Sequence, residues 1–468
     1  MSALIRQLKY LLVPAAVLGV VTLTSAMRPA PGPLEQVLVR GELVVATRPA
    51  PTTYYQDQYG ETGLDYELAA GFANTLGVNL RILEADTLDE LFALVHSGKA
   101  DMAAAGLSIT PERRQRLAFS TAYQTVQEKV VHRMGILRVR GPEDLSGLRG
   151  VVMAGSSHAE RLSELASELE HIEFETLEGA SAERLLTLVD EGLFDYTLID
   201  SNAYAIHRPL FPELVSGFDA GEAMLGWAFR KHNDGSLRHS AQRYLTRAKA
   251  DGTVAALDQR FYSHQDHFNL YAARSFIQHL DSRLPQYTQA FIDAGEATGF
   301  DWRMLAALGY QESMWDADAV SPTGVRGLMM LTLRTAREMG VADRTDPYES
   351  IHAGAAYLRK IYDRIPERIA EPDRTWFALA AYNAGFGHME DARVLTQRKG
   401  GNPDLWADVE QHMPKLRQAR YYQHARHGYA SGGGQAVIYV RAIRGYYDTL
   451  VWAGTSERHN RTMLAMVD

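Results

Sequence analysis

The residue best placed for acid–base chemistry is Glu312, in a segment whose pattern predicts a helix. Residues 301–315 read DWRMLAALGYQESMW. On a helix, Glu312 shares a face with Leu308 and Leu305, four and seven residues before it. Gly309 leaves room beside the carboxyl group. Partial desolvation favours the neutral carboxyl, which donates a proton near neutral pH. A lone glutamate near a helix end more often points to solvent, so the assignment depends on other segments.

Three later segments complete a set of motifs with Glu312 and the serine after it. They are SPTGVRGLMMLTLRTA at 321–336, AYNAGFGHM at 381–389 and a helix around Tyr439. In this order they resemble the motifs of the soluble-lytic-transglycosylase catalytic domain, which are E-S, G-L-M-Q-L/I-x-x-x-T-A, A-Y-N-A-G-x-G and a late tyrosine. The resemblance covers about 275–455 and implies an all-α, goose-lysozyme-like domain.

The resemblance also implies a role for each matching residue. Glu312 acts as the acid and then as the base, and Ser313 supports it or the sugar. Two positions depart from the family pattern: Met330 stands where the family usually has glutamine, and Gly434-Gln435 stands where a glutamate is expected. The residues expected to line the glycan cleft are Ser313, Met329, Met330, Tyr382, Asn383 and Tyr439.

A single carboxylate suffices if the family reaction applies, although ordinary glycosidases need two. The implied reaction cleaves the β-1,4 bond between N-acetylmuramic acid and N-acetylglucosamine and leaves a 1,6-anhydromuramyl end. One alternative is a lysozyme-type hydrolase that uses Glu312 with Asp316 or Asp318. Another is a non-catalytic protein that binds solutes or cell wall.

No cofactor or metal is expected, because cysteine is absent and the 16 histidines show no H-E-x-x-H spacing.

A second family resemblance lies in the front half of the chain. Residues 98–123 read GKADMAAAGLSITPERRQRLAFSTAY, 142–157 read PEDLSGLRGVVMAGSS and 194–200 read FDYTLID. These segments resemble the extracellular solute-binding proteins of family 3. The resemblance covers about 40–265 and implies two α/β lobes with a ligand between them.

In that family a turn arginine grips a carboxylate and a second-lobe aspartate takes an ammonium group, and the matching residues are Arg113 and Asp200. A guanidinium fork suits a carboxylate, and Ser108 adds a hydroxyl group. The expected ligands are amino acids or muropeptides, whose binding would regulate the rear domain. The alternative is a spacer or wall-tethering domain descended from a receptor. Without the resemblance, the sequence around Arg113 indicates only a solvated helix start with Thr110 as its N-terminal cap. Asp200 would then simply cap the helix that follows it.

The elements that position these residues divide the chain into two domains, as its 468 residues suggest. From 40 to 268, short β-branched runs alternate with amphipathic segments, which predicts an α/β domain with largely parallel sheets. From 269 to 455 only helical patterns follow, including one near 328–339. The predicted fold is therefore a two-lobed periplasmic-binding-protein-like domain followed by a goose-lysozyme-like helical domain, with a tail at 456–468.

The N-terminus indicates export. Arg6 and Lys9 precede an apolar run that ends near Thr22, which is typical of a signal peptide over 1–26, followed by a linker at 27–39. A retained anchor is the alternative. The net charge of -9 without long basic runs argues against nucleic acid and favours a sugar partner.

The order of the two domains is that of the membrane-bound lytic murein transglycosylase F family, which the chain resembles over nearly its full length. This resemblance implies a periplasmic enzyme, peripherally associated with the outer membrane, that acts on peptidoglycan glycan strands.

Overall fold

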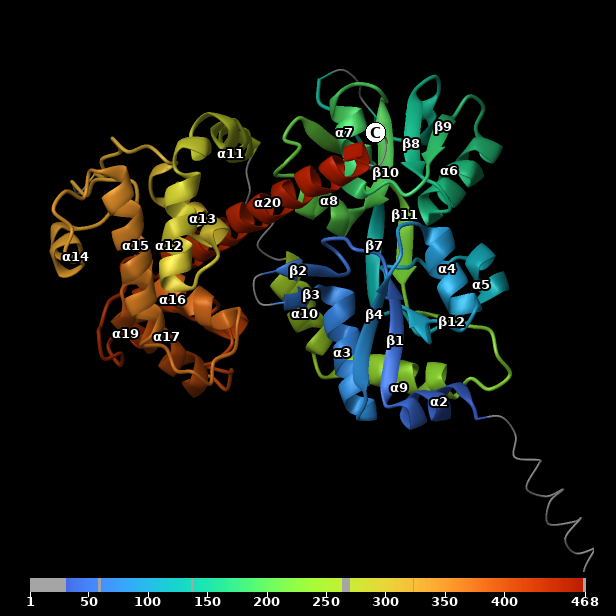
Figure 1. Ribbon diagram of the computed structural model, residues 1–468, viewed down its shortest axis with the longest axis horizontal. Helices are drawn as coiled ribbons and strands as arrows, with labels where there is room; N and C mark the ends of the chain where they lie inside the picture. The colour runs from blue at the N-terminus through green and yellow to red at the C-terminus, as the bar shows by residue number, and fades with distance from the viewer. Residues whose placement is uncertain (1–30, 58–59, 136–138, 263–269, 323, 466–468) are drawn as a thin grey trace, which may run out of the picture.

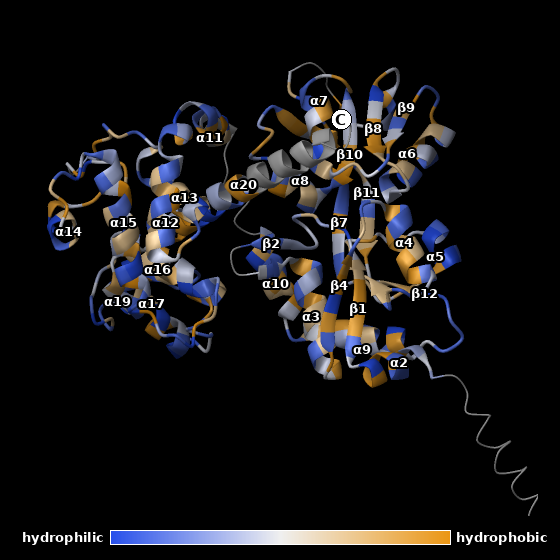
Figure 2. Ribbon diagram, viewed as in Figure 1, coloured by the Kyte–Doolittle hydropathy of each residue, from blue (hydrophilic) through white to orange (hydrophobic). Residues whose placement is uncertain are grey.

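The computed structural model describes residues 31–57, 60–135, 139–262, 270–322 and 324–465, and the predicted signal peptide lies outside them. The front half forms an α/β domain with two lobes, and the rear half is helical (Figure 1). Each lobe is built on a five-stranded sheet. The hydrophobic residues gather on the strands and on the inner faces of the helices that cover them (Figure 2).

Lobe one is made from both ends of the front domain. Its sheet has the order β4-β1-β5-β12-β6, in which β1 pairs in parallel with β4 and β5, whereas β12 is antiparallel to its neighbours. The strands are β1 (Glu42–Thr47), β4 (Asn79–Glu84), β5 (Met102–Ala103), β6 (Leu117–Phe119) and β12 (Ala228–Arg230), with a hairpin of β2 (Tyr55–Asp57) and β3 (Gly60–Thr62). The helices are α2 (Pro33–Arg40), α3 (Leu64–Leu76), α4 (Leu88–His96), α5 (Pro111–Arg116), α9 (Ser236–Ala250) and α10 (Thr253–Tyr262).

Lobe two is inserted between β6 and β12. Its sheet has the order β11-β7-β10-β8-β9, in which β8 pairs in parallel with β9 and β10, and β7 is antiparallel to β10 and β11. The strands are β7 (Gln124–Arg133), β8 (Arg149–Met153), β9 (Glu173–Leu177), β10 (Tyr196–Asp200) and β11 (Leu214–Leu225). The helices are η1 (Pro142–Leu145), α6 (Ser157–Glu168), α7 (Ala182–Asp190) and α8 (Ser201–His207).

The sheets are mixed, although the sequence predicted largely parallel ones. The antiparallel strands are those that carry the chain between the lobes: β7 leaves lobe one, and β11 and β12 return to it. At this crossing the Tyr123 amide donates to the Leu225 carbonyl at 3.0 Å. A chain that leaves a lobe and returns to it adds strands of the opposite direction, a feature that the βα alternation alone does not reveal.

The rear domain packs its helices around α13 and α20, which contact each other along one buried core. The long helix α20 runs from this core toward lobe two (Figure 1). The elements are α11 (Leu270–Ser282), η3 (Leu284–Gln286), α12 (Thr288–Thr298), α13 (Trp302–Ser313), α14 (Leu333–Glu338), α15 (Pro347–Tyr362), α16 (Asp373–Ala384), α17 (Phe386–Arg398), α18 (Trp406–Val409), η4 (Met413–Arg417), α19 (Ala419–Tyr422) and α20 (Gly433–Ala465).

Both lobes contact the rear domain. In lobe one, the Arg260 carbonyl accepts a hydrogen bond from the Arg444 guanidinium. The Gln259 side-chain amide donates to Glu410 Oε1 at 3.1 Å. In lobe two, Glu213 receives two hydrogen bonds from the guanidinium of Arg274 on α11, at 2.6 and 2.7 Å. The rear domain is therefore joined to each of the two lobes.

Three expectations need correction: those for the linker, for the helix in the second catalytic motif and for the C-terminal tail. The linker expected at 27–39 is a helix in its second half, because Pro33 starts α2 and Gly41 ends it in the left-handed conformation. Its Val37 is fully buried in the core of lobe one.

The helix predicted near 328–339 begins only at Leu333. Gly327 and Met330 have φ angles of 89° and 47°, which a helix does not accept, and the Thr332 side chain caps the Thr335 amide. The segment before it is therefore a tight loop. The final helix, in turn, continues to Ala465, through most of the tail expected from 456.

Candidate active site

Glu312 lies in the last turn of α13, which is fixed at both ends. The Asp301 side chain caps the start by accepting the Arg303 amide at 2.9 Å. The helix ends in two consecutive left-handed residues, Met314 at φ 53° and Trp315 at φ 55°. Such strain in residues other than glycine persists only where the surroundings hold it, as they often do at functional sites.

Two hydrogen bonds hold this strained turn. The Trp315 indole is buried and donates to the Ala306 carbonyl at 2.8 Å. The Arg283 guanidinium donates to the Met314 carbonyl at 2.9 Å. The backbone that carries Glu312 is thus anchored directly after the carboxylate.

The carboxyl group of Glu312 is half-buried and has a neutral partner. The Tyr439 hydroxyl, on α20, donates to Glu312 Oε1. Burial raises the pKa of Glu312 from 4.5 to about 7, and the hydrogen bond from Tyr439 only partly opposes this shift. Within the described residues no hydrogen bond engages Oε2. Glu312 therefore holds a proton near neutral pH and has an oxygen available to a substrate.

The other residues predicted for the cleft lie around this group in different ways. Tyr439 contacts Glu312 directly, and the negative charge of Glu312 adds to burial in raising the pKa of Tyr382. The Tyr382 hydroxyl donates to the Met329 carbonyl at 3.1 Å. Met330 is half-buried and Asn383 is exposed at the end of α16.

Two of the predicted cleft residues differ from expectation. The Met329 side chain is fully buried against Gly309 and Gly354. Met329 therefore contributes to the site through its carbonyl, which accepts the hydrogen bond of Tyr382. Ser313 is also buried, and its hydroxyl donates to the Gly309 carbonyl at 3.2 Å. Because this bond runs back along the helix, the Ser313 hydroxyl is engaged with the backbone of α13.

Sequence reasoning missed the residues that hold the loop before α14. The Ser350 hydroxyl, on α15, is fully buried and accepts the Met329 amide at 3.0 Å. Gly354 lies one turn later, where an added Cβ would fall 2.7 Å from Met329. The small residues of the segment from Ser350 to Ala356 were the available signal, since helices approach a backbone closely through such residues.

The alternative second acids lie in the loop after Trp315. The Asp318 amide donates to Asp316 Oδ1 at 3.0 Å. Among the residues that the structure describes, no hydrogen bond joins either aspartate to Glu312. The hydrogen bonds between these described residues therefore join Glu312 to Tyr439 and to neither aspartate.

The front cleft brings together the three residues predicted for it. Arg113 and Ser108 belong to lobe one, and Asp200 ends β10 in lobe two. Arg113 is only 7% exposed and donates to the carbonyls of Ser108, at 3.2 Å, and Gly155, at 3.1 Å. The Ser108 and Ser157 hydroxyls are 2.9 Å apart. These contacts join the lobes directly.

The sequence reasoning missed His158 in this cleft. Its Nε2 lies 3.0 Å from Asp200 Oδ1, and Asp200 makes no side-chain capping bond to α8. The motif G-S-S-H at the start of α6 was a signal, because β8 and β10 are parallel neighbours and the residues directly after each strand lie at the same edge of the sheet.

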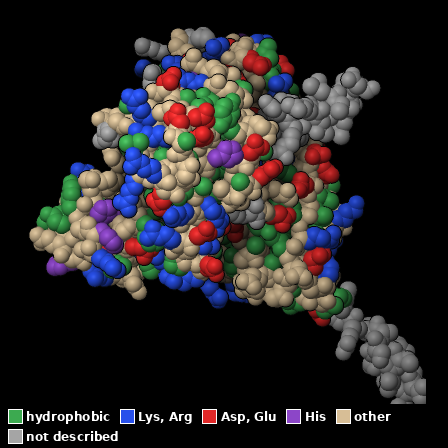
Figure 3. All heavy atoms as spheres, turned by 60° about the vertical axis from the view of Figure 1, so that its left-hand side comes forward, with side chains coloured by type: hydrophobic (Ala, Val, Ile, Leu, Met, Phe, Trp, Pro, Cys, Tyr) green, Lys and Arg blue, Asp and Glu red, His purple; other side chains and the backbone are tan. Residues whose placement is uncertain are grey.

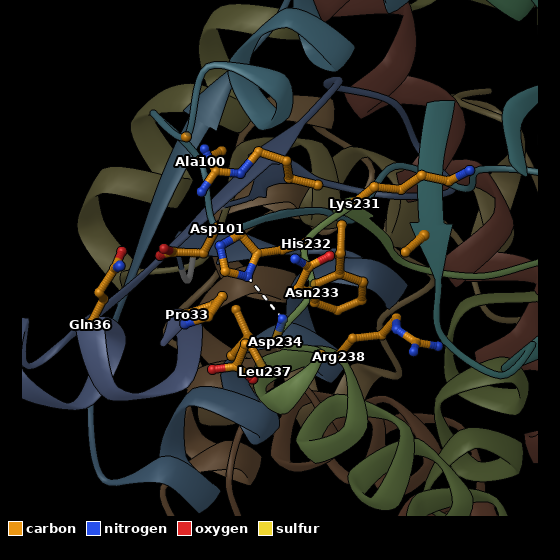
Figure 4. Close-up of a pocket in the computed structure, with 15 residues that line it drawn as sticks. Pro33, Gln36, Ala100, Asp101, Lys231, His232, Asn233, Asp234, Leu237 and Arg238 are labelled. Atoms are coloured by element: carbon orange, nitrogen blue, oxygen red, sulfur yellow. Dashed lines mark hydrogen bonds between the residues drawn. The ribbon is translucent and has the colours of Figure 1, made fainter. Parts of the chain in front are cut away.

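A cavity of about 350 Å³ lies elsewhere, at the end of lobe one that carries α2 (Figure 4). The Asp234 amide donates to His232 there at 3.0 Å, and Lys231 donates to the Gln115 carbonyl. Neither Glu312 nor Arg113 lines it. Its mixed charges are largely engaged with the protein, and we assign it no role.

The surface and the metal-ligating residues complete the description. Lys, Arg, Asp and Glu side chains are interspersed on the face shown in Figure 3, without a continuous basic stripe. In the described part of the chain no group of three His, Cys, Asp or Glu side chains is arranged to hold a metal ion. The described helices include none that is long and apolar enough to span a membrane.

Comparison with known families places both sites in matched segments. The family described as "Transglycosylase SLT domain" matches residues 289–404, which include Glu312 and Tyr382. The family "Bacterial extracellular solute-binding proteins, family 3" matches residues 43–264, which include Arg113 and Asp200.

Curated relatives match the whole chain. A membrane-bound lytic murein transglycosylase F from Alcanivorax borkumensis is 56% identical over 467 residues, covering 100% of both chains. Its namesake from Ectopseudomonas mendocina is 47% identical and covers 94% of this chain and 92% of its own. Among solved structures, a mutant of ArgBP from T. maritima is 26% identical, with a TM-score of 0.45, over 49% of this chain and 99% of its own.

Proposed function

The chain belongs to the membrane-bound lytic murein transglycosylase F family and is a lytic murein transglycosylase, and on this premise we propose that Glu312 alone supplies its acid and base. The substrate is the glycan strand of peptidoglycan. The observation that carries the proposal is the half-buried Glu312, with a pKa raised to about 7 and the neutral hydroxyl of Tyr439 on Oε1.

The first step is proton donation. Protonated Glu312 gives its proton to the glycosidic oxygen between C1 of N-acetylmuramic acid and O4 of N-acetylglucosamine, and the C1–O bond breaks. Donation leaves a carboxylate in a partly desolvated place, where the Tyr439 hydroxyl supplies a hydrogen bond to the new charge. The Tyr439 bond thus favours the state that follows donation.

The second step uses the same carboxylate as a base. Glu312 removes the proton of the C6 hydroxyl of the muramyl residue, whose oxygen attacks C1 and closes a 1,6-anhydro ring. No water is consumed, and Glu312 ends protonated, ready for the next cycle. An internal nucleophile of this kind has an effective molarity of roughly 10⁵ M or more when it is well oriented.

Mass spectrometry of the products of purified peptidoglycan tests this mechanism. The expected products are one water lighter than those of hydrolysis, and Glu312→Gln is expected to lower turnover by about 10³- to 10⁴-fold, because an amide cannot protonate the leaving oxygen. Asp316→Asn and Asp318→Asn are the matched controls and are expected to retain activity within about threefold. Hydrated products that disappear in either aspartate variant would establish the lysozyme-type alternative.

The remaining expectations extend this proposal. The cleft between the lobes is a ligand site that regulates cleavage, since Arg113 and Asp200 face it from both sides. The boundary between the domains lies near 268, between the two segments that the family models match. The enzyme acts in the cell envelope, as the name of its relatives suggests, and its finer location is the periplasm at the outer membrane after export by the leader at 1–26.

Calorimetry with muropeptides, paired with assays of Arg113→Ala, tests the regulatory part. A change in cleavage rate on ligand addition that Arg113→Ala abolishes supports it. The absence of both binding and any effect of the variant refutes it.

A further inference from the structure

The rear domain carries a long stretch without acidic residues, although the whole protein has a net charge of -9. No aspartate or glutamate lies between Glu410 and Asp448, and the lysines and arginines of this stretch are Lys415, Arg417, Arg420, Arg426, Arg441 and Arg444. The last two lie in α20 and bind Glu410 and the Arg260 carbonyl. The other four lie on η4, on α19 and in the loop that leads to α20. This part of the surface is therefore positively charged.

One part of this stretch lies against the C-terminal end of α17 (Figure 1). The Arg398 guanidinium, at the end of that helix, donates to the His424 carbonyl at 3.2 Å. Two cations lie close to the ring of Tyr421: Lys399 Nζ is 5.5 Å and the Arg420 guanidinium carbon 4.8 Å from its centroid. Each cation is attracted to the ring, which thus holds two like charges close together.

Another part of the stretch lies beside the N-terminal half of α17, next to the catalytic site. Asp391, in the second turn of the helix, accepts the His427 amide at 2.8 Å. A Cβ added at Gly387 would fall 2.6 Å from the ring of His427. Gly387 belongs to the same motif as Tyr382, whose pKa is raised by burial and by the charge of Glu312. The segment therefore runs along α17 from its far end to the edge of the catalytic site.

Three cations along this line are here named the cationic track: Lys399, Arg420 and Arg426. All three are exposed, and among the described residues none of them forms an ion pair. Arg420 donates only to the side-chain oxygen of Gln418, at 2.8 and 3.0 Å. The buried Arg393 of α17, by contrast, binds Glu390 and Asp404 at 2.6 and 2.5 Å. Like charges gathered without counter-charges attract an anion.

The track has the length and the charge to receive a peptide. Helix α17 has 13 residues, which corresponds to roughly 20 Å at about 1.5 Å per residue. The stem peptide that peptidoglycan carries on N-acetylmuramic acid has about four or five residues and spans roughly 15 Å when it is extended. It holds more carboxylates than amines, because its γ-linked glutamate, its diamino acid and its last residue each leave one carboxylate free.

Resting on the proposed cleavage at Glu312, we propose that the cationic track binds the carboxylates of the stem peptide on the N-acetylmuramic acid in the cleft. The enzyme therefore prefers glycan strands that carry peptides over bare strands. Arg426 binds the carboxylate nearest the sugar, and Lys399 and Arg420 bind those farther along the peptide. Contacts of exposed charges add modestly to affinity, but they fix the direction in which the peptide leaves the cleft.

Cleavage of two substrates by the full chain tests the proposal: glycan strands with their stem peptides, and the same strands after an amidase has removed the peptides. The wild type is expected to cleave the first with a kcat/KM about three- to tenfold higher, mainly through a lower KM. The double variant Lys399→Ala/Arg420→Ala is expected to bring this ratio close to one. Raising the salt concentration from about 0.05 M to about 0.5 M should do the same, because exposed charges are then screened.

Two further variants are the controls. Lys399→Arg/Arg420→Lys keeps both charges and is expected to keep the ratio, which separates the effect of charge from that of local packing. Arg243→Ala/Arg247→Ala removes two exposed arginines of α9 in lobe one and is the matched control for net charge. The cleft between the lobes is the same in all these variants, so any peptide binding there cancels in the comparison.

A wild-type ratio near one, or an unchanged ratio in Lys399→Ala/Arg420→Ala, would overturn the proposal. So would a double variant that loses only its binding to vesicles of phosphatidylethanolamine and phosphatidylglycerol, because the track would then face a membrane. Anhydro products together with a ratio near one refute the track alone. Hydrated products, with a ratio above one that the double variant abolishes, refute the catalytic proposal alone.

Discussion

The two sites of this protein bury a carboxyl group in opposite surroundings. Glu312 in the rear domain meets a neutral hydroxyl, that of Tyr439, and its pKa is raised to about 7. Asp200 in the front domain meets an imidazole at 3.0 Å, and the pKa of that imidazole is raised. Both groups are largely buried, yet one becomes a proton donor and the other binds an imidazole whose protonated form it favours.

The charge of the neighbouring group thus decides the chemistry of a buried carboxyl group. Desolvation disfavours any charge, so a carboxyl without a cation keeps its proton and is suited to general acid catalysis. A cation beside the carboxylate offsets that cost and makes the site one for recognition of charge. Exchanging the partners should therefore exchange the behaviour.

The largest effect is expected from giving Glu312 the cation that Asp200 has. Tyr439→Lys places an ammonium group beside Glu312, lowers the pKa of its carboxyl and is expected to reduce turnover at neutral pH by about 10²- to 10³-fold. Because protonation then requires more acid, the optimum should move to lower pH. Rates of cleavage from about pH 4 to about pH 9 measure both effects. An unchanged optimum would contradict the comparison.

A smaller effect is expected from removing the neutral partner. The hydrogen bond from Tyr439 lowers the pKa of Glu312, so Tyr439→Phe should raise it and move the alkaline limb of the pH profile upward by less than about one unit. Turnover should fall by about tenfold, since the carboxylate formed by donation loses a donor. Tyr439→Phe and Tyr439→Lys are thus expected to shift the pH profile of cleavage in opposite directions. A substitution that only disturbed the local packing would lower the rate without moving either limb of the profile.

The sequence predicted the chemistry of the rear site better than its packing. The spacing of Glu312 with Leu308 and Leu305 predicted desolvation, and the structure confirms a half-buried carboxyl group. The Met329 side chain, by contrast, is buried, because Gly309 and Gly354 open a space that only the tertiary packing of α13 and α15 creates. Motif matching indicates that a residue is near a site, whereas only packing decides which of its atoms faces it.

In the front cleft the sequence indicated residues but no pairing. Arg113 and Asp200 came from motifs, and each was expected to receive a ligand. His158 ends the motif G-S-S-H, but it meets Asp200 because β8 and β10 are adjacent in the sheet, although 42 residues separate the two side chains. Strand order is a long-range property, so the pairing of His158 with Asp200 could not be inferred from local patterns alone.

Removing the pair in the front cleft should change stability in a pH-dependent way. The folded pKa of His158 is raised, so the ion pair stabilises the fold fully below the unfolded pKa and loses its contribution as pH rises through the folded value. Asp200→Asn is expected to cost about 2 kcal/mol at about pH 6 and less at about pH 9. Denaturant unfolding measures it. Asp219→Asn, which breaks the exposed pair with Lys129, is the control and should cost less than about 0.5 kcal/mol.

The smallest effect should come from the rear carboxyl and have the opposite sign. The folded pKa of Glu312 is raised, so its ionisation destabilises the folded state as pH rises from the unfolded value toward about 7 and beyond. Glu312→Gln removes this penalty and is expected to gain about 1 kcal/mol at about pH 8, or about 2 °C in Tm, and almost nothing at about pH 4. Glu338→Gln is the matched control. Lys360 lowers the pKa of Glu338, so the Glu338→Gln substitution should reduce stability at the higher pH.

The substrate binds where Glu312 is desolvated. A stability gain in the inactive Glu312→Gln variant would therefore show that keeping a proton donor at this position destabilises the fold. Equal Tm values for wild type and Glu312→Gln across this range would mean that the carboxyl is solvated, and the contrast with Asp200 would then fail.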